Sequence, residues 1–141
     1  MAPAQQLYAC GVLNGFVVDW LLRQKITSHL NMFYVYQVPM PRDGATEHAP
    51  RITHRAARLI CTTPEFDDLA KAVGLRSHRD GATDPAERAR LRAELDGLVA
   101  HLYGLSEAEF AHILTTFPLV PDPVKTAAQN AYRDVERGLI K

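Results

Sequence analysis

The chain has 141 residues, 47% hydrophobic and 23% charged, which is the composition of one globular domain long enough to bury a core. Lys plus Arg and Asp plus Glu are balanced at 16 each, so the chain has no overall field that would attract it to nucleic acid or to a membrane surface. This balance counts against a free-standing DNA-binding domain, which would be more basic.

The cysteine content and the apolar runs predict where the protein is found. Cys10 and Cys61 are expected to be buried free thiols in a reducing compartment. The N-terminus has neither the basic start nor the cleavage site of a signal peptide. The longest apolar run, residues 15–22, is interrupted by Asp19 and is too short to cross a bilayer. We therefore expect a cytoplasmic protein without membrane contact.

Residues 7–24 are predicted to form one helix with apolar side chains on most of its faces. The buried stripe follows helical spacing and consists of Leu13, Phe16, Val17, Trp20 and Leu21. Gly11 and Gly15, four residues apart, leave a flat edge where a neighbouring element can pack closely. Such a helix needs neighbours on two sides.

Residues 32–38 are predicted to form a short strand, because β-branched and aromatic side chains fill both of its faces. Pro39 and Pro41 would end this strand, since proline cannot donate to a ladder. A lone strand has no partner within the chain, so we expect a second polypeptide or another copy to pair with it. The residues expected to take part in self-association are Phe16, Trp20, Phe33, Tyr34 and Tyr36.

From residue 51 onward the pattern is helical. A short helix opens at Thr63-Pro64 and closes at Gly74, and a long helix begins after Asp84. The long helix carries two potential i,i+4 ion pairs, Arg90–Glu94 and Arg92–Asp96.

The end of the long helix and the remaining helices are also marked in the sequence. Gly104 ends the long helix, and Ser106 with Glu109 forms a capping box that starts the next one over 107–117. A final helix is expected over 124–139. The predicted fold is mainly α, with about six helices and one short β-strand (32–38), packed orthogonally around the helical hairpin 91–117. The predicted organisation is a helix-plus-strand segment, 1–41, and a helical C-terminal domain, 51–141.

No catalytic, cofactor-binding or metal-binding residues are predicted. The six histidines are scattered, and the sequence contains neither a glycine-rich phosphate loop nor a nucleophile elbow. Pro64-Glu65 and Pro121-Asp122 are not interpreted as nuclease motifs, because they fall at a helix start and in a proline connector instead of on paired strands.

The polar pattern most indicative of a binding site is a stripe of basic residues. Arg51, Arg55 and Arg58 are spaced four and three apart, so they share one helix face, and Arg76 and Arg79 form a second basic cluster. Converging arginines bind phosphates through charge and forked hydrogen bonds, which makes these five residues candidates for contact with DNA phosphates. The alternative is the solvated face of an ordinary amphipathic helix.

Several segments of the chain, in order, resemble the C-terminal region of Eco57I-type restriction–modification proteins, which are N6-adenine DNA methyltransferases often fused to an endonuclease. The resemblance is carried by Leu13-Asn14-Gly15-Phe16, Arg23-Gln24-Lys25, His29-Leu30-Asn31-Met32-Phe33, Gln37-Val38-Pro39-Met40-Pro41, Leu91-Arg92-Ala93-Glu94-Leu95-Asp96, His101-Leu102-Tyr103-Gly104-Leu105 and Ile113-Leu114-Thr115-Thr116-Phe117-Pro118. The family's Asn/Asp-Pro-Pro-aromatic catalytic motif, its S-adenosylmethionine site and its nuclease lobe have no counterpart in this sequence.

The resemblance implies a non-catalytic C-terminal segment that braces the target-recognition region and contacts DNA phosphates. Its expected partners are a methyltransferase or recognition subunit, or a missing N-terminal part, together with DNA and a possible second copy of the chain. The alternative is a helical protein–protein interaction or oligomerisation module that does not touch nucleic acid. An enzymatic function ranks third.

Overall fold

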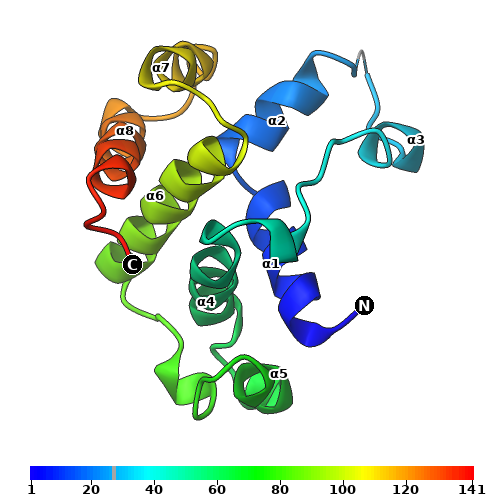
Figure 1. Ribbon diagram of the computed structural model, residues 1–141, viewed down its shortest axis with the longest axis vertical. Helices are drawn as coiled ribbons and strands as arrows, with labels where there is room; N and C mark the ends of the chain where they lie inside the picture. The colour runs from blue at the N-terminus through cyan, green and yellow to red at the C-terminus, as the bar shows by residue number, and fades with distance from the viewer. Residues whose placement is uncertain (27) are drawn as a thin grey trace.

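The computed structural model describes residues 1–26 and 28–141, and within these residues the chain is a helical bundle without a strand (Figure 1). The mainly α prediction is confirmed. The helices are α1 (Pro3–Leu13), α2 (Phe16–Arg23), α3 (Met32–Val35), α4 (His48–Ile60), α5 (Asp67–Ala72), α6 (Pro85–Leu102), α7 (Glu107–Thr115) and α8 (Asp122–Glu136). Short 3-10 turns lie at Asp43–Ala45, Pro64–Phe66 and His78–Asp80.

Helix α6 lies at the centre of the bundle, with α4 on one side and α8 on the other (Figure 1). Its most extensive contact is with α8, so the fold is organised around this pair and not around the 91–117 hairpin. The two backbones approach closely at Gly97, where an added Cβ would lie 2.7 Å from the Tyr132 nitrogen. Helix α1 packs on α4, while α2 packs on α7 and α6.

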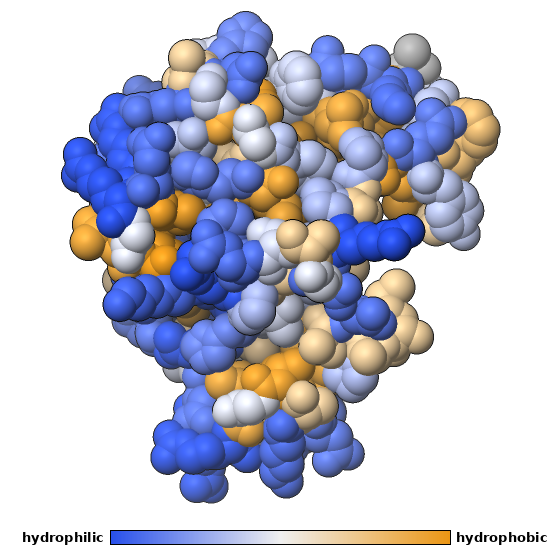
Figure 2. Space-filling model, in the orientation of Figure 1, coloured by the Kyte–Doolittle hydropathy of each residue, from blue (hydrophilic) through white to orange (hydrophobic). Residues whose placement is uncertain are grey.

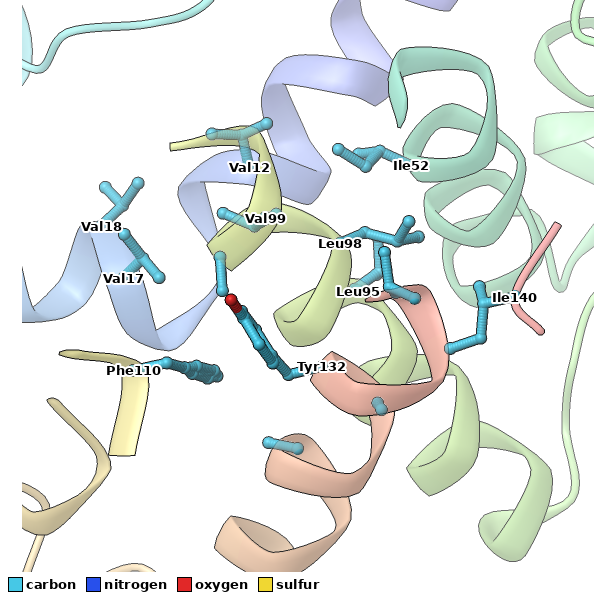
Figure 3. Close-up of a cluster of buried hydrophobic side chains, with 14 of the residues drawn as sticks. Val12, Val17, Val18, Ile52, Leu95, Leu98, Val99, Phe110, Tyr132 and Ile140 are labelled. Carbon is cyan, nitrogen blue, oxygen red and sulfur yellow. The ribbon is translucent and has the colours of Figure 1, made fainter. Parts of the chain in front are cut away.

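One large hydrophobic core joins the N-terminal and C-terminal helices (Figure 3). Fully buried side chains at its centre come from α1, α2, α4, α6 and α7: Val12, Val18, Ile52, Leu98, Val99 and Phe110. The core therefore draws side chains from both predicted segments, 1–41 and 51–141. A smaller cluster around Cys61 and Ala70 lies beneath α5.

The single helix expected over 7–24 is two helices, because the chain breaks at Asn14 and Gly15. Gly15 has an extended backbone (φ −99°, ψ 170°), and the Asn14 side-chain amide donates to the Cys10 carbonyl at 2.8 Å. The next backbone N–H, that of Phe16, donates to the carboxylate of Asp96 at 3.0 Å. An acceptor 80 residues away thus allows α2 to start in a new direction, which local spacing could not indicate.

The predicted strand over 32–38 is wrong. Residues Met32–Val35 form the one-turn helix α3, and local hydrogen bonds continue beyond it, from the Tyr36 N–H to the Met32 carbonyl (2.9 Å) and from the Val38 N–H to the Val35 carbonyl (3.1 Å). A strand without a partner would leave these groups unpaired, whereas a turn of helix satisfies them within the segment. Without a neighbouring strand among the described residues, the β propensity of the aromatic run had no ladder to join, and the local hydrogen bonds decided its conformation.

The helix boundaries predicted from Gly74, Gly104 and the Ser106–Glu109 capping box agree with the structure, whereas the last helix, expected over 124–139, runs over Asp122–Glu136. Gly74 and Gly104 have positive φ angles of 89° and 69°, and both arms of the Ser106–Glu109 capping box are formed. Helix α4 starts at His48, earlier than expected, with Pro50 in its first turn, where a missing N–H costs little. Among the described residues, no helix combines the length and apolar character needed to cross a bilayer.

Candidate functional site

The segment around α3 exposes several large apolar side chains. Leu30 and Met32 are each 57% exposed, Phe33 is 66% exposed and Tyr36 is 80% exposed. Helix α3 lies at the edge of the bundle (Figure 1), and at this edge Figure 2 shows apolar side chains on the surface among polar ones. Single exposed apolar residues are ordinary, but four within seven residues are typical of an interaction surface. We call these four residues the α3 patch.

The residues predicted to take part in self-association have different surroundings. Phe33 and Tyr36 belong to the α3 patch, whereas Tyr34 is half-buried and meets the Phe33 ring edge-on at 5.7 Å. Phe16 packs edge-on against Phe117, with 5.0 Å between ring centroids, so its ring contacts the core of the same chain and not the α3 patch. Trp20 is half-buried on α2.

The three arginines of the predicted basic stripe do lie on α4, but two of them are paired inside the molecule. Arg55 is only 8% exposed, and its Nε donates to a Glu94 oxygen at 2.7 Å. Its Nη2 also donates to the Lys141 carbonyl at 3.2 Å. Arg58 donates to Glu87 at 2.6 Å and to the Asp80 carbonyl at 3.1 Å. These bonds tie α4 to α6 and to the loop that precedes it.

The remaining predicted arginines lie nearer the surface. Arg51 approaches Glu47 at 3.7 Å. Arg76, with a side chain 90% exposed, makes a forked pair with Asp80 at 2.6 and 3.1 Å, and these bonds lower the pKa of the Asp80 carboxyl to about 2. Arg79 is exposed and makes no ion pair with any described residue.

A cavity of about 490 Å³ lies between the α1–α2 break, α4 and α6. Its floor is apolar and includes Ala56, Leu59 and Leu95. One wall is a face of α6 that carries Arg88, Arg92 and Asp96 at i, i+4 and i+8. The volume falls within the range of pockets that hold small ligands, which is about 300–1,000 Å³.

Asp96 stands at the end of this wall, where its carboxylate receives the N–H of Phe16 at the start of α2. Burial raises the pKa of this carboxyl to about 7, and the Phe16 hydrogen bond opposes that rise. The expected Arg92–Asp96 ion pair is not formed, because Asp96 turns to α2 instead, whereas the expected Arg90–Glu94 pair is formed at 2.6 Å.

The described residues contain no group of three or more His, Cys, Asp or Glu side chains arranged to hold a metal ion. The cavity wall is the feature that sequence reasoning missed. The four-residue spacing of Arg88, Arg92 and Asp96 on the long helix could have indicated a shared face, but this spacing does not show that the face lines a cavity.

Comparisons with known proteins return no match: no family model, no curated protein and no solved structure is similar to this chain.

Proposed function

We propose that this chain is a non-catalytic segment of a restriction–modification system of the adenine methyltransferase type, and that it braces the target-recognition region of its partner. The observation that carries the proposal is the α3 patch. Leu30, Met32 and Phe33 belong to a segment through which the chain resembles the Eco57I-type proteins, and all three side chains are more than half exposed.

The packing of the bundle gives no reason for apolar side chains at these positions. The core is formed by other residues, so replacing Phe33 with a polar residue would leave it intact. A partner that covers the patch would remove this apolar surface from water, which is the main favourable term in most protein association. This supports a docking role for the segment that bears the family resemblance.

Contact with DNA phosphates, if it accompanies docking, would depend on the arginines nearer the surface. Arg55 and Arg58 are held by Glu94 and Glu87 of α6, and withdrawing either arginine would take a close partner from a partly buried carboxylate, which would keep only its contact with Arg90. Arg51, Arg76 and Arg79 are the members of the predicted set that could turn to a phosphate at lower cost.

Docking is tested by co-expressing the chain with an Eco57I-type adenine methyltransferase that retains its target-recognition region, and by measuring affinity with the purified components. The double variant Phe33→Ser/Tyr36→Ser should bind at least tenfold more weakly. Leu119→Ser is the matched control, because Leu119 is 96% exposed and lies outside the patch. Equal binding by the double variant, or no binding by the wild type, would refute the docking proposal.

The second candidate is a protein–protein interaction or oligomerisation module without nucleic-acid contact. The internal pairing of Arg55 and Arg58 favours it, because this pairing removes much of the basic stripe from the surface. A salt titration of DNA binding separates the two candidates. Phosphate contact predicts affinity that falls with salt and a shallower slope in the triple variant Arg51→Ala/Arg76→Ala/Arg79→Ala. Absence of binding at low salt would favour the second candidate.

A further inference from the structure

The charges on α6 are distributed unequally between two faces. On the face toward α4, Glu87 and Glu94 neutralise Arg58, Arg55 and Arg90 at distances of 2.6–2.7 Å for their closest pairs. On the cavity face, Arg88 and Arg92 form no ion pair with any carboxylate among residues 1–26 and 28–141. The cavity lining therefore holds two arginines without ion pairs, together with two carboxylates that have other partners: Asp19 pairs with Arg23 at 2.8 Å, and Asp96 accepts from the Phe16 N–H.

Arg88 is held in place even though its charge is not neutralised. Its Nη1 donates to the carbonyls of Leu59 at 2.9 Å and Ala82 at 2.7 Å, which fixes the guanidinium between α4 and the start of α6. Neutral carbonyls orient a guanidinium but do not cancel its charge. An anion at this end of the cavity would therefore meet a positioned donor group with little reorganisation.

The rest of the cavity suits an apolar chain. Ala56, Leu59 and Leu95 form its floor, and Val124 from α8 contributes to the lining. Along α6, Arg88 and Asp96 are eight residues apart, which corresponds to about 12 Å at 1.5 Å per residue. Arg92 is four residues, or about 6 Å, from Asp96, so a head group that pairs with both arginines would lie toward the Arg88 end, at least about one helical turn from the Asp96 carboxyl.

We propose that this cavity is a binding site for a small amphipathic carboxylate, whose head group pairs with Arg88 and Arg92 and whose apolar chain lies on the floor formed by Ala56, Leu59 and Leu95. The two arginines favour a negatively charged ligand, and the cavity volume limits the length of the ligand's apolar tail. This site is separate from the α3 patch, so it stands independently of the docking role proposed above.

The test is a titration of the ¹⁵N-labelled protein, followed by amide chemical shifts, with octanoate and with octylamine as a probe of the same chain length and opposite charge. Octanoate at millimolar concentration should shift amides in residues 56–60 and 88–96, and it should bind at least fivefold more tightly than octylamine. Equal binding of the two probes, shifts confined to residues 30–36, or no shifts at all would overturn the proposal.

Two variants test the role of the arginines. Arg92→Gln removes an exposed side chain without an ion pair and should weaken octanoate binding at least threefold while leaving the fold intact. Arg90→Gln removes the same charge from the opposite face of α6 and should leave binding unchanged. If both variants lose affinity equally, or if neither does, the head-group assignment is wrong.

Discussion

The backbone N–H of Phe16 donates to the carboxylate of Asp96 at 3.0 Å, and this bond joins the start of α2 to the middle of α6. Both residues belong to segments through which the chain resembles the Eco57I-type proteins, although 80 positions separate them. The carboxylate replaces the missing side-chain cap at Gly15.

Replacing Asp96 with Asn should flatten the pH dependence of stability. The carboxyl binds its proton more tightly in the folded chain, with a pKa of about 7, than in the unfolded chain, where the pKa is about 3.9. Its contribution is therefore fully present below about pH 4 and is lost as the pH rises through about 7. Asn keeps an acceptor oxygen for the Phe16 N–H but does not ionise.

Between about pH 5 and pH 8, the free energy of unfolding should therefore fall less in Asp96→Asn than in the wild type, by at least about 1 kcal/mol. Urea denaturation at several pH values measures this difference. The histidines are common to both proteins, so the difference between the two profiles isolates position 96. Asp96→Ala also loses the acceptor and should be less stable than Asp96→Asn at every pH, and superimposable profiles for wild type and Asp96→Asn would contradict the assignment.

Gly97→Ala should destabilise the protein strongly. The added methyl group would lie 2.7 Å from the Tyr132 nitrogen and 2.8 Å from the Ala131 carbonyl carbon, and both are backbone atoms of a packed helix. Separating α6 from α8 enough to admit it should cost about 2 kcal/mol or more. Gly44→Ala is the control, because its new methyl group would meet no atom within 4 Å. Thermal unfolding that shows equal losses for the two variants would argue against this close crossing.

Arg55→Ala should cost about 3 kcal/mol of stability, because it leaves Glu94 without its closest buried partner and removes the bond to the Lys141 carbonyl. Arg76→Ala should change the free energy of unfolding far less than Arg55→Ala, since the Arg76 side chain is 90% exposed. Chemical denaturation of both variants checks this contrast. A small effect at Arg55 would mean that Arg90 alone can hold the Glu94 carboxylate.

Ser106→Ala should lower the free energy of unfolding by about 1 kcal/mol, because it removes the acceptor for the Glu109 N–H at the start of α7. Ser106→Asp should recover most of the loss, because aspartate is also a good N-cap residue. Urea denaturation of the pair measures both effects. Failure of Asp to restore stability would show that the hydroxyl acts through some other contact.

Features encoded by neighbouring residues were predictable, and features that depend on distant partners were not. Gly104 and the Ser106–Glu109 box mark a helix boundary within six residues, and the structure confirms it. By contrast, the run from Phe33 to Tyr36 has strand-forming residues, but no strand lies beside it in the described chain. The α2 start at Phe16 likewise depends on Asp96, which no local pattern connects to it.

The same distinction applies to the candidate sites. Sequence spacing correctly put Arg51, Arg55 and Arg58 on one helix, but it could not show that Glu87 and Glu94 of another helix face two of them. The cavity is formed by residues of five helices, α1, α2, α4, α6 and α8, and is visible only once they are packed.

The central position of α6 has a consequence for how the protein tolerates mutation. Gly97 allows the close approach of α8, and Glu94 pairs with Arg55 of α4. Asp96 accepts the first N–H of α2, and Arg88 donates to a carbonyl of the loop before α6. Nearby positions on this one helix therefore make different contacts that the fold needs. A saturation library measured without a partner should therefore show few tolerated substitutions over residues 94–100 of α6, whereas the exposed positions of α3 should accept nearly any residue.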